Sequence, residues 1–461
     1  MSTHKVIQQS TYDEVIRENV VDLDMTPGEA IEDASIQFKS QGVSLSSIVT
    51  NPSVIKTDDG IDIIHKVKVA IEKVESQAND PTKGDEIKNQ LKIIKDECQL
   101  SFAHRFLAAN SGAFTVLTSL WTTHLNEVVV ALSALVNGQP DLFDVTTLKL
   151  IQNTLLEHVA DASLSSQLLF LIQLACIKHE NNRQILVDND ILTPLIKCLK
   201  VHKLPEVTKN ACAALRALVL DDDIRVQYGR AHDHAKDIVI KHAALPLFSE
   251  LLQESHDVTI ASDIVLTVSR LMVRHEFCKE MADFGVLTHL FQGLKNYAEN
   301  QTFVQNVLLL LKALAGNDHV QKEIVKENGT ELIIFATQKH ILKSKVCKAA
   351  CGTLATLALR SPQHCAIIVK AGGATLITRM MEAHGLDAGV LQQACLAIRN
   401  LVARAQDLVP NFLELGAERL IRNAQEHHPA IADEAKAALR DLGCMIEFRE
   451  PWTGKKGSLQ N

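Results

Sequence analysis

A segment of about 43 residues recurs along the chain, and this recurrence restricts the possible folds more than any other feature of the sequence. Gly285, Gly329, Gly373 and Gly416 mark it, with spacings of 44, 44 and 43 residues. Each glycine follows a short helical stretch and precedes a new apolar one, as in MADFGVLTHLFQGL. A unit of this length cannot bury its apolar face alone, so neighbouring copies must stack into one continuous core.

Two further observations extend the series upstream. Gly112 occupies the same place in AANSGAFTVLTSL, and Asp190 replaces the glycine in VDNDILTPLIKCL. A second motif follows each of these positions, in the forms ALSAL, FLIQL, ALRAL, TVSRL, LLKAL, TLATL, AIRNL and ALRDL. The two motifs together indicate about eight copies between residues 97 and 444.

Each copy is predicted to contain three helices. The short first helix ends at the glycine, which adopts a left-handed backbone conformation without the penalty that a Cβ brings. The second and third helices are amphipathic, with apolar residues at i, i+3, i+4 and i+7. The sequence therefore predicts an all-α, right-handed superhelical solenoid of about eight repeats with short N-terminal helices.

The period, the glycine between the first two helices and the A-x-x-x-L-x-x-L third helix resemble the armadillo-repeat family over roughly 350 of the 461 residues. FKSQGVSLSSIV (38–49), CIKHENNRQILV (176–187) and AALRDLGC (437–444) are similar to one branch of that family. The resemblance implies a protein-binding scaffold without catalytic activity. HEAT-type repeats are the alternative architecture, but they lack the short first helix that GNDHVQKEIVKENG (316–329) requires.

The stretch DDDIRVQYGRAHDHAKDI (221–238) concentrates charged residues. Aligning DDDIRVQYG with the first helix of its repeat leaves about 11 extra residues, which we assign to an insertion near 229–241. The aspartates suit a helix start, where they cap free N–H groups, and Arg225 and Arg230 can pair with them. Because insertions in solenoids emerge as surface loops, this one is predicted to contact a partner.

His232 and His234 give the same stretch a second interpretation. On a helix these side chains point about 200° apart and cannot share a metal ion, whereas in an extended loop they can lie on one side. The first hypothesis is that both histidines, with Arg225 and Arg230, belong to a structural or partner-binding segment. The alternative is a metal- or phosphate-dependent enzyme built on the insertion.

Third helices of successive repeats lie about 8–10 Å apart, so equivalent positions form rows along a concave face. One row carries Arg216, Lys312, Arg399 and Arg440, and Arg270 lies one place further on in another copy. We expect these cations to attract acidic or phosphorylated protein segments. The alternative is that they are solvated or pair with acidic residues of adjacent helices.

The family resemblance adds an expectation about this concave face. In peptide-binding armadillo proteins, an asparagine row holds the backbone of an extended peptide, and tryptophans one turn earlier cradle its side chains. Here only Asn400 matches the asparagine position, and the tryptophan position holds residues such as Gly352 and Leu396. A nuclear-transport-type carrier is therefore only an alternative function.

Composition narrows the classes of partner. The net charge of −8 argues against a general binder of nucleic acids or membrane surfaces. There is no run of 18 apolar residues that would predict a membrane span. The polar N-terminus lacks the apolar region of a signal peptide. We therefore expect protein partners, without nucleic acid or membrane, in the cytoplasm or the nucleus.

The ten cysteines include no Cys-x-x-Cys pair, and most lie within apolar helical patterns. This usage predicts buried, reduced thiols. Cys347 and Cys351 share a helix face, for which core packing is the first expectation and a zinc or redox pair the alternative. No phosphate-binding loop, dinucleotide fingerprint, His-Glu-x-x-His or nucleophile-elbow motif is present, so we expect neither catalysis nor a cofactor.

The segments outside the repeats complete the predicted organisation. Thr26 is expected to cap a helix, with Glu29 completing a capping box. Trp452 is expected to cover the exposed end of the last helices. The predicted parts are an acidic helical segment, a linker, a helical N-terminal cap, the repeats and a tail, at 1–49, 50–60, 61–97, 98–444 and 445–461.

Overall fold

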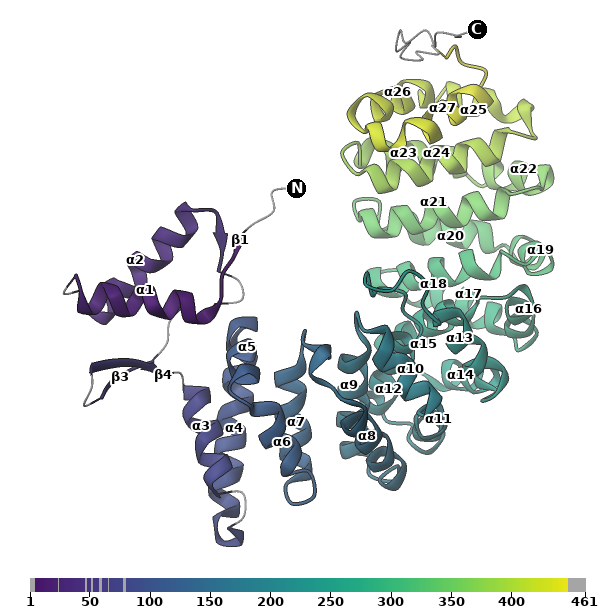
Figure 1. Ribbon diagram of the computed structural model, residues 1–461. Coiled ribbons are helices and arrows are strands. Elements are labelled where there is room, and N and C mark those ends of the chain that lie inside the picture. Colours follow the sequence, from purple (N-terminus) through teal and green to yellow (C-terminus); the bar gives the residue numbers. More distant parts are fainter. Residues whose placement is uncertain are drawn as a thin grey trace, which may run out of the picture. The chain divides into compact units, whose positions relative to one another are not determined.

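The computed structural model describes residues 5–23, 25–45, 48–50, 53–57, 60–64, 66–77 and 80–446. The chain divides into two compact units, residues 1–238 and 239–461, and each is described by itself. Both consist mainly of helices (Figure 1). The predicted role of Trp452 falls on a residue outside the described ranges.

The N-terminal segment has a small core of its own. Helices α1 (Gln9–Val21) and α2 (Pro27–Ser40) pack together around Tyr12, Ile16 and Phe38. Strand β1 (Lys5–Val6) pairs in parallel with β2 (Val43–Ser44). The predicted capping box is confirmed: Glu29 N–H donates to Thr26 Oγ1, and Thr26 N–H donates to Glu29 Oε2 at 3.0 Å.

The residues expected to form a linker at 50–60 lie largely in a hairpin. Strand β3 (Ser53–Thr57) pairs antiparallel with β4 (Gly60–Ile64), with Ser53 opposite Ile64. The sequence SVIKT-DD-GIDII has β-branched residues on each side of two aspartates, and such residues favour strands. The linker prediction is therefore wrong for the residues that form these two strands.

Unit 1 continues with α3 (Lys66–Gln77), the 3-10 turn η1 (Pro81–Lys83) and α4 (Gly84–Leu100), where two cap helices are predicted. The first repeat is α5 (Phe102–Asn110), α6 (Ala113–Ser119) and α7 (Leu125–Val136). In the second, the 3-10 turn η2 (Pro140–Leu142) replaces the first helix before α8 (Val145–Glu157) and α9 (Ala162–Cys176). The third is α10 (Glu180–Asp188), α11 (Leu192–Val201) and α12 (Pro205–Leu218).

The boundary between the units falls within α13 (Ala231–Ile240), the first helix of the fourth repeat, whose other helices are α14 (Ala244–Glu254) and α15 (Val258–Leu271). The fifth repeat is α16 (His275–Asp283), α17 (Val286–Asn296) and α18 (Gln301–Leu314). The sixth is α19 (Asp318–Lys326), α20 (Gly329–Gln338) and α21 (Ser344–Ala358). The seventh is α22 (Pro362–Lys370), α23 (Gly373–Ala383) and α24 (Ala388–Val402).

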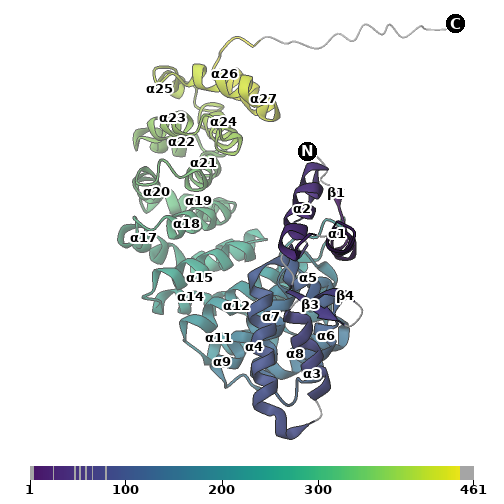
Figure 2. The same ribbon diagram turned by 90° about the vertical axis from the view of Figure 1, so that its left-hand side faces the viewer.

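The eighth repeat is η3 (Gln406–Leu408), α25 (Val409–Leu413), α26 (Ala417–His427), η4 (Pro429–Ile431) and α27 (Ala432–Asp441). In unit 2 the third helices contact one another in chain order, α15 to α18 to α21 to α24 to α27, and Figure 2 shows this succession. In unit 1, α4, α7, α9 and α12 do the same. The predicted all-α repeat fold is confirmed, with two short strand pairs added near the N-terminus.

The left-handed turn after the first helix is confirmed at Gly112, Gly285 and Gly416. In two other repeats it lies one residue earlier than predicted, at Asn328 and at Gly372. Gly329 and Gly373 instead begin the second helix, where a Cβ would lie 2.6 Å from Ile324 O and 2.6 Å from Ile368 Cγ2. These two glycines are therefore needed for close packing and not for their backbone angle.

The insertion also lies elsewhere than predicted. Residues 231–240 form the first helix of their repeat, with Ala235 and Ile238 buried, so they are regular. The extra residues are 219–230, which connect α12 to α13, whereas 272–274 and 315–317 suffice in the next two repeats. The predicted boundaries 229–241 are wrong because DDDIRVQYG was aligned with a first helix that AHDHAKDIVI forms.

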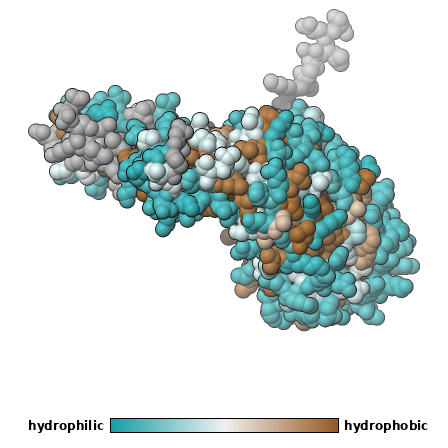
Figure 3. Space-filling view, turned by 90° about the horizontal axis from the view of Figure 1, so that it is seen from below, coloured by the Kyte–Doolittle hydropathy of each residue, from teal (hydrophilic) through white to brown (hydrophobic). Residues whose placement is uncertain are grey.

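Within the described ranges, no helix is long and apolar enough to cross a lipid bilayer. The face drawn in Figure 3 is largely hydrophilic, with apolar residues in scattered patches. Exposed apolar side chains nevertheless recur at related places in the repeats.

Candidate functional site

The charged connection 219–230 lies over the start of α10, the first helix of the preceding repeat. Asp222 accepts a hydrogen bond from the backbone N–H of Lys178 at 3.1 Å, and Asp223 accepts one from that of Glu180 at 2.9 Å. The aspartates therefore cap a helix start, as predicted, but the helix begins more than 40 residues earlier in the chain. Carboxylates at this end also interact favourably with the helix dipole.

Arg183 is the centre of this arrangement, and its side chain is fully buried. Its Nε donates to Glu180 Oε2 at 2.8 Å, and its Nη1 donates to Asp222 Oδ1 at 2.6 Å and to Cys176 O at 2.9 Å. A buried guanidinium is tolerated only when it is paired and hydrogen-bonded. Glu180 of α10 and Asp222 of the connection meet this requirement at Nε and Nη1, so Arg183 joins the connection to α10.

Two further arginines hold the outside of the connection. Arg225 donates to both carboxylate oxygens of Asp223 and, at 2.6 Å, to Asp141 of the second repeat. The backbone N–H of Arg230 donates to Glu180 Oε1 at 2.7 Å, and its side chain lies 3.2 Å from Asp188. We call Asp141, Glu180, Arg183, Asp222, Asp223, Arg225 and Arg230 the charged clamp.

The pKa values of the clamp carboxyls follow from these contacts. The hydrogen bond from Arg225 holds the pKa of Asp141 below its usual value, and it holds that of Asp223 far below. Burial acts to raise the pKa of Glu180, but hydrogen bonds from Arg230 N–H, Gln184 and Arg183 outweigh it and the pKa is lowered. All three groups are therefore ionised near neutral pH and act as fixed acceptors.

The two histidines do not converge. His232 is exposed, whereas His234 is fully buried and its Nδ1 donates to Leu218 O at 2.9 Å. In the part of the chain that the structure describes, no group of three or more His, Cys, Asp or Glu side chains is placed to hold a metal ion. The geometry makes residues 221–238 a structural clamp followed by a helix, with Ile224 and Tyr228 exposed at its surface.

The cysteines are free thiols, and nine of the ten are buried. Cys347 lies 3.2 Å from Ile341 O, and Cys351 lies 4.0 Å from the sulfur of Met380, so both side chains pack within the repeat core. Burial raises the pKa of Cys176 and of Cys347 to about 12, so these thiols are protonated at neutral pH. This environment favours core packing for the Cys347–Cys351 pair.

The predicted basic row on the third helices divides into two groups. Arg399 lies 3.5 Å from Asp441 and Arg440 lies 2.8 Å from the same carboxylate, so both have an acidic neighbour. Arg216 is half-buried and also has a partner. Arg270 and Lys312 are exposed, and within the described ranges neither forms an ion pair. Only this second group has its charge available to a ligand.

The structure adds Lys348 to the available cations. It lies on α21 and is exposed, again without an ion pair among the described residues. A Cβ added to Gly389 on α24 would lie 3.2 Å from its Nζ, and a Cβ added to Gly352 on α21 would lie 3.0 Å from that of Lys312. Each lysine therefore lies across a glycine of the next third helix, a pairing that a scan for charges alone does not find.

Asn400, the one match to the asparagine row, donates from Nδ2 to Ala355 O of the preceding third helix at 2.9 Å. Its amide is thus used between repeats. With the tryptophan row absent as well, the third helices of this chain differ from the basic-peptide groove that the family resemblance implies.

The three-helix unit, the left-handed turn after its first helix and the adjacent third helices define an armadillo-repeat protein. The family model ARMC6 matches residues 63–461, and the model for the armadillo repeat-containing protein 6 N-terminal domain matches residues 4–80. The chain belongs to the armadillo repeat-containing protein 6 family. This confirms the resemblance carried by FKSQGVSLSSIV and CIKHENNRQILV.

Similar proteins support this assignment over the full length. Armadillo repeat-containing protein 6 of Homo sapiens is 45% identical, with 99% of this chain and 94% of the relative covered. The homologue of Drosophila melanogaster is 42% identical, with 98% of each covered. A crystal structure of an engineered protein has a TM-score of 0.64 at 17% identity, covering 95% of this chain and 96% of its own, and shows the fold alone.

The first prediction concerns the buried arginine. Replacing Arg183 by methionine leaves the carboxylates of Glu180 and Asp222 without their shared partner, and breaking a buried ion pair in this way costs about 3–5 kcal/mol. We expect the local opening free energy of α10, measured by amide hydrogen exchange, to fall by about this amount. Arg225→Met, at the exposed side of the clamp, is the control and should have a much smaller effect. Equal effects of the two substitutions would contradict the central role of Arg183.

The second prediction concerns acid. The pKa values of Asp141, Glu180 and Asp223 are lower in the folded chain than in the unfolded chain, so their contribution to stability is fully present above the unfolded values, about pH 4. It is lost as the pH falls further, toward the folded values. Limited proteolysis within 219–230 should therefore accelerate between about pH 4 and pH 2, with an acid-active protease. A cleavage rate that rises already between pH 7 and pH 5 would show that the clamp is not held by these carboxylates.

Proposed function

We propose that this chain is a non-catalytic scaffold that binds acidic or phosphorylated protein segments along the third helices of unit 2. The observation that carries the proposal is the pair of exposed lysines, Lys312 and Lys348, each lying across a glycine of the neighbouring third helix. Arg270 adds a third exposed cation on α15. These three cations are the binding row.

The glycines explain how the binding row is formed. A side chain at Gly352 would lie 2.9 Å from Gln393 Oε1 as well as 3.0 Å from Lys312 Nζ, so neither group could keep its position. Without a side chain, the aliphatic stem of Lys312 covers α21 while its ammonium group faces solvent. Gln393 Oε1, beside the same glycine, is buried and has no hydrogen-bond partner among the described residues, so the exposed groups at this place are the lysine cations.

The chemistry of the row selects the kind of ligand. Ammonium and guanidinium groups form charge-assisted hydrogen bonds with carboxylates and phosphates. The net charge of −8 does not favour nucleic acids or anionic membranes, so a protein segment is the partner we propose. A phosphorylated residue brings about two negative charges and three acceptor oxygens, and therefore suits two neighbouring lysines.

A solved structure of the same fold concerns a protein interaction that phosphorylation controls. A structure of the beta-catenin and cadherin system has a TM-score of 0.52 at 15% identity and covers 82% of this chain, and it concerns a phosphorylation switch that controls their interaction. The likeness concerns the fold, and we extend the mode of binding to this chain as a proposal. The free state of all ten cysteines supports the further proposal of a cytoplasmic or nuclear location.

The nuclear-transport-type alternative has less support. It requires an asparagine row for the peptide backbone, and Asn400 already bonds to Ala355. It also requires an acidic or aromatic surface for basic signals, whereas the binding row carries positive charge. The charged clamp does not support the enzyme alternative. Its carboxylates already accept hydrogen bonds from arginines and backbone N–H groups.

The third prediction tests the binding row with peptides. The full chain is presented to random 15-residue peptides that carry serine or phosphoserine at the centre, and the enriched peptides are measured by fluorescence anisotropy. We expect phosphoserine peptides to be enriched and their affinity to fall as salt is raised, because screening weakens exposed charge pairs. Lys312→Glu with Lys348→Glu should weaken binding by at least about tenfold.

Lys322→Glu with Lys326→Glu is the matched control, because both lysines lie on the first helix α19 and the change in net charge is the same. Peptide affinity should stay within about twofold in this variant. If both double variants weaken binding equally, the effect is one of overall charge and the binding row is not the site.

A further inference from the structure

A His-x-Leu pattern recurs where second helices connect to third helices. It reads HKL at 202–204, HIL at 340–342 and HGL at 384–386. In each copy the histidine Nε2 donates to a carbonyl oxygen of the preceding repeat: His202 to Val159, His340 to Ala298 and His384 to Ile341, at 2.5, 2.8 and 2.8 Å. His428 continues the series by donating to Gly385 O at 3.2 Å. These bonds fix the connections in place.

The leucine of each copy is held in solvent. The exposed fraction is 52% for Leu204, 75% for Leu342 and 86% for Leu386. Single exposed leucines are common on protein surfaces, whereas exposed apolar side chains gathered at a cavity indicate a contact surface. Leu342 and Leu386 stand beside such a cavity, whereas Leu204 does not line it.

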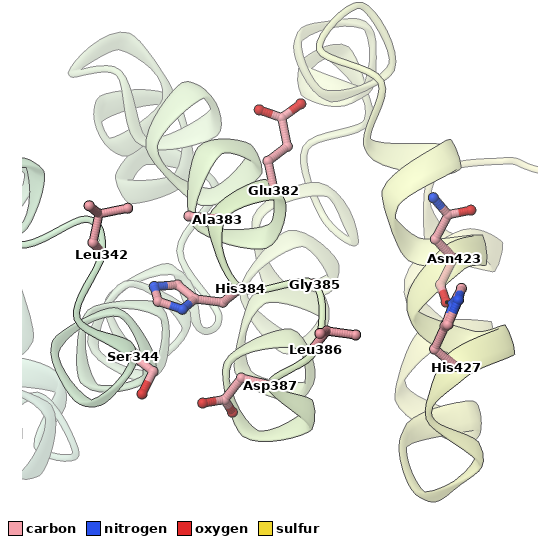
Figure 4. Close-up of a pocket in the computed structure, with 10 residues that line it drawn as sticks. All are labelled: Leu342, Ser344, Glu382, Ala383, His384, Gly385, Leu386, Asp387, Asn423 and His427. Carbon is pink, nitrogen blue, oxygen red and sulfur yellow. Dashed lines mark hydrogen bonds between the residues drawn. The ribbon is translucent and has the colours of Figure 1, made fainter.

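The cavity has a volume of about 710 Å³ and runs along one edge of unit 2. Figure 4 shows its parts: Leu342 and Ser344 from the connection before α21 and its first residue, Glu382 to Asp387 from the end of α23 and the connection after it, and Asn423 and His427 from α26. The side chain of Leu386 points toward α26. We call this cavity the edge groove.

The edge groove combines apolar and acidic chemistry. Glu382 and Asp387 contribute carboxylates, and none of its ten lining residues is a lysine or an arginine. Asp387 also caps α24 by accepting from Gly389 and Val390 N–H, so its charge is fixed in position. Glu382 has only a loose contact with Arg419, at 3.8 Å. Such a lining suits a segment with apolar and basic side chains and repels phosphate groups.

The end of the chain has this composition. The last eleven residues, PWTGKKGSLQN, include Trp452, Lys455, Lys456 and Leu459 and no acidic residue. Residues 447–450 add Phe448 and Arg449 but also Glu447 and Glu450, so the excess of cations is confined to residues 451–461. Residues 451–461 therefore supply apolar groups that can pack on the leucines of the edge groove and cations that can pair with its carboxylates.

The path of the described chain brings this segment close to the groove. After Gly443 turns the backbone with φ +73°, the thiol of Cys444 lies near Glu418, and Met445 O accepts from Arg422 at 2.9 Å. The chain thus follows α26 toward its C-terminal end, where His427 lines the groove. Fifteen residues span up to about 50 Å when extended, and five residues of helix rise only about 7.5 Å.

We propose that residues 447–461 dock in the edge groove, with Trp452 against Leu342 and Leu386 and with Lys455 and Lys456 facing Glu382 and Asp387. Tethering favours this occupant, because a short linker gives a segment an effective concentration in the millimolar range. This position of Trp452 differs from the one expected from the sequence, in which Trp452 covers the exposed end of the last helices. It does not depend on the proposed function, because the edge groove and the binding row consist of different residues.

The fourth prediction tests the proposal on the full chain. Amide hydrogen exchange is compared between the unchanged chain and a variant with Trp452→Ala, Lys455→Glu and Lys456→Glu. We expect exchange in the connections 340–343 and 384–387 to accelerate at least about fivefold, while exchange in α19 is unchanged. Gln460→Ala is the control within the tail and should change neither. Unchanged exchange in both connections would overturn the proposal.

A second readout identifies the groove side of the contact. A fluorescein-labelled peptide of residues 447–461 is titrated into the full chain that carries Trp452→Ala, Lys455→Glu and Lys456→Glu, and binding is followed by anisotropy. We expect saturable binding that weakens at least about tenfold in Leu342→Ser with Leu386→Ser or in Glu382→Lys, and that persists in Leu204→Ser. These side chains are exposed, so the fold is retained. If the groove variants bind the peptide as tightly as the Leu204→Ser control, the tail does not occupy the edge groove and the groove belongs to another occupant.

Discussion

The packing of each third helix against the next is the interaction on which the structure depends. Buried leucine, isoleucine, valine and alanine side chains cover one another only when a neighbouring repeat is present. Polar links reinforce this contact at the same spacing: Asn210 donates to Ser166, and Asn306 donates to Ser262, in each case across 44 residues. A ligand surface made of third helices is therefore rigid, because the core that supports the chain also positions its exposed side chains.

Residues 219–230 show how an irregular connection is accommodated in such a repeat. Its aspartates cap α10, and its charge is neutralised by Arg183 and Arg225. A cluster of aspartates and arginines in the sequence therefore stabilises the joint between two repeats. The surfaces suited to ligands lie elsewhere and differ in sign: cations of the binding row on the third helices, and carboxylates and leucines in the edge groove.

The sequence predicted what depends on local periodicity and missed what depends on distant contacts. The period, the third helices and the capping box of Thr26 follow from spacing and residue type, and all are confirmed. The turn at Asn328 was misplaced by one residue, because a glycine required for packing follows it. The clamp and the lysine–glycine pairs join residues about 40 to 84 apart, so no local pattern reveals them. The His-x-Leu recurrence, in contrast, is visible in the sequence once the repeats are aligned.

The central claim is that the third helices of unit 2 form the ligand surface. Amide hydrogen exchange of the full chain, with and without a saturating phosphoserine peptide, tests it most directly. Exchange should slow in α18, α21 and α24, near Lys312 and Lys348, and stay unchanged in the first helices α19 and α22. Slowing confined to residues 219–230 or to the first helices would contradict the claim and return the charged connection to consideration as the site.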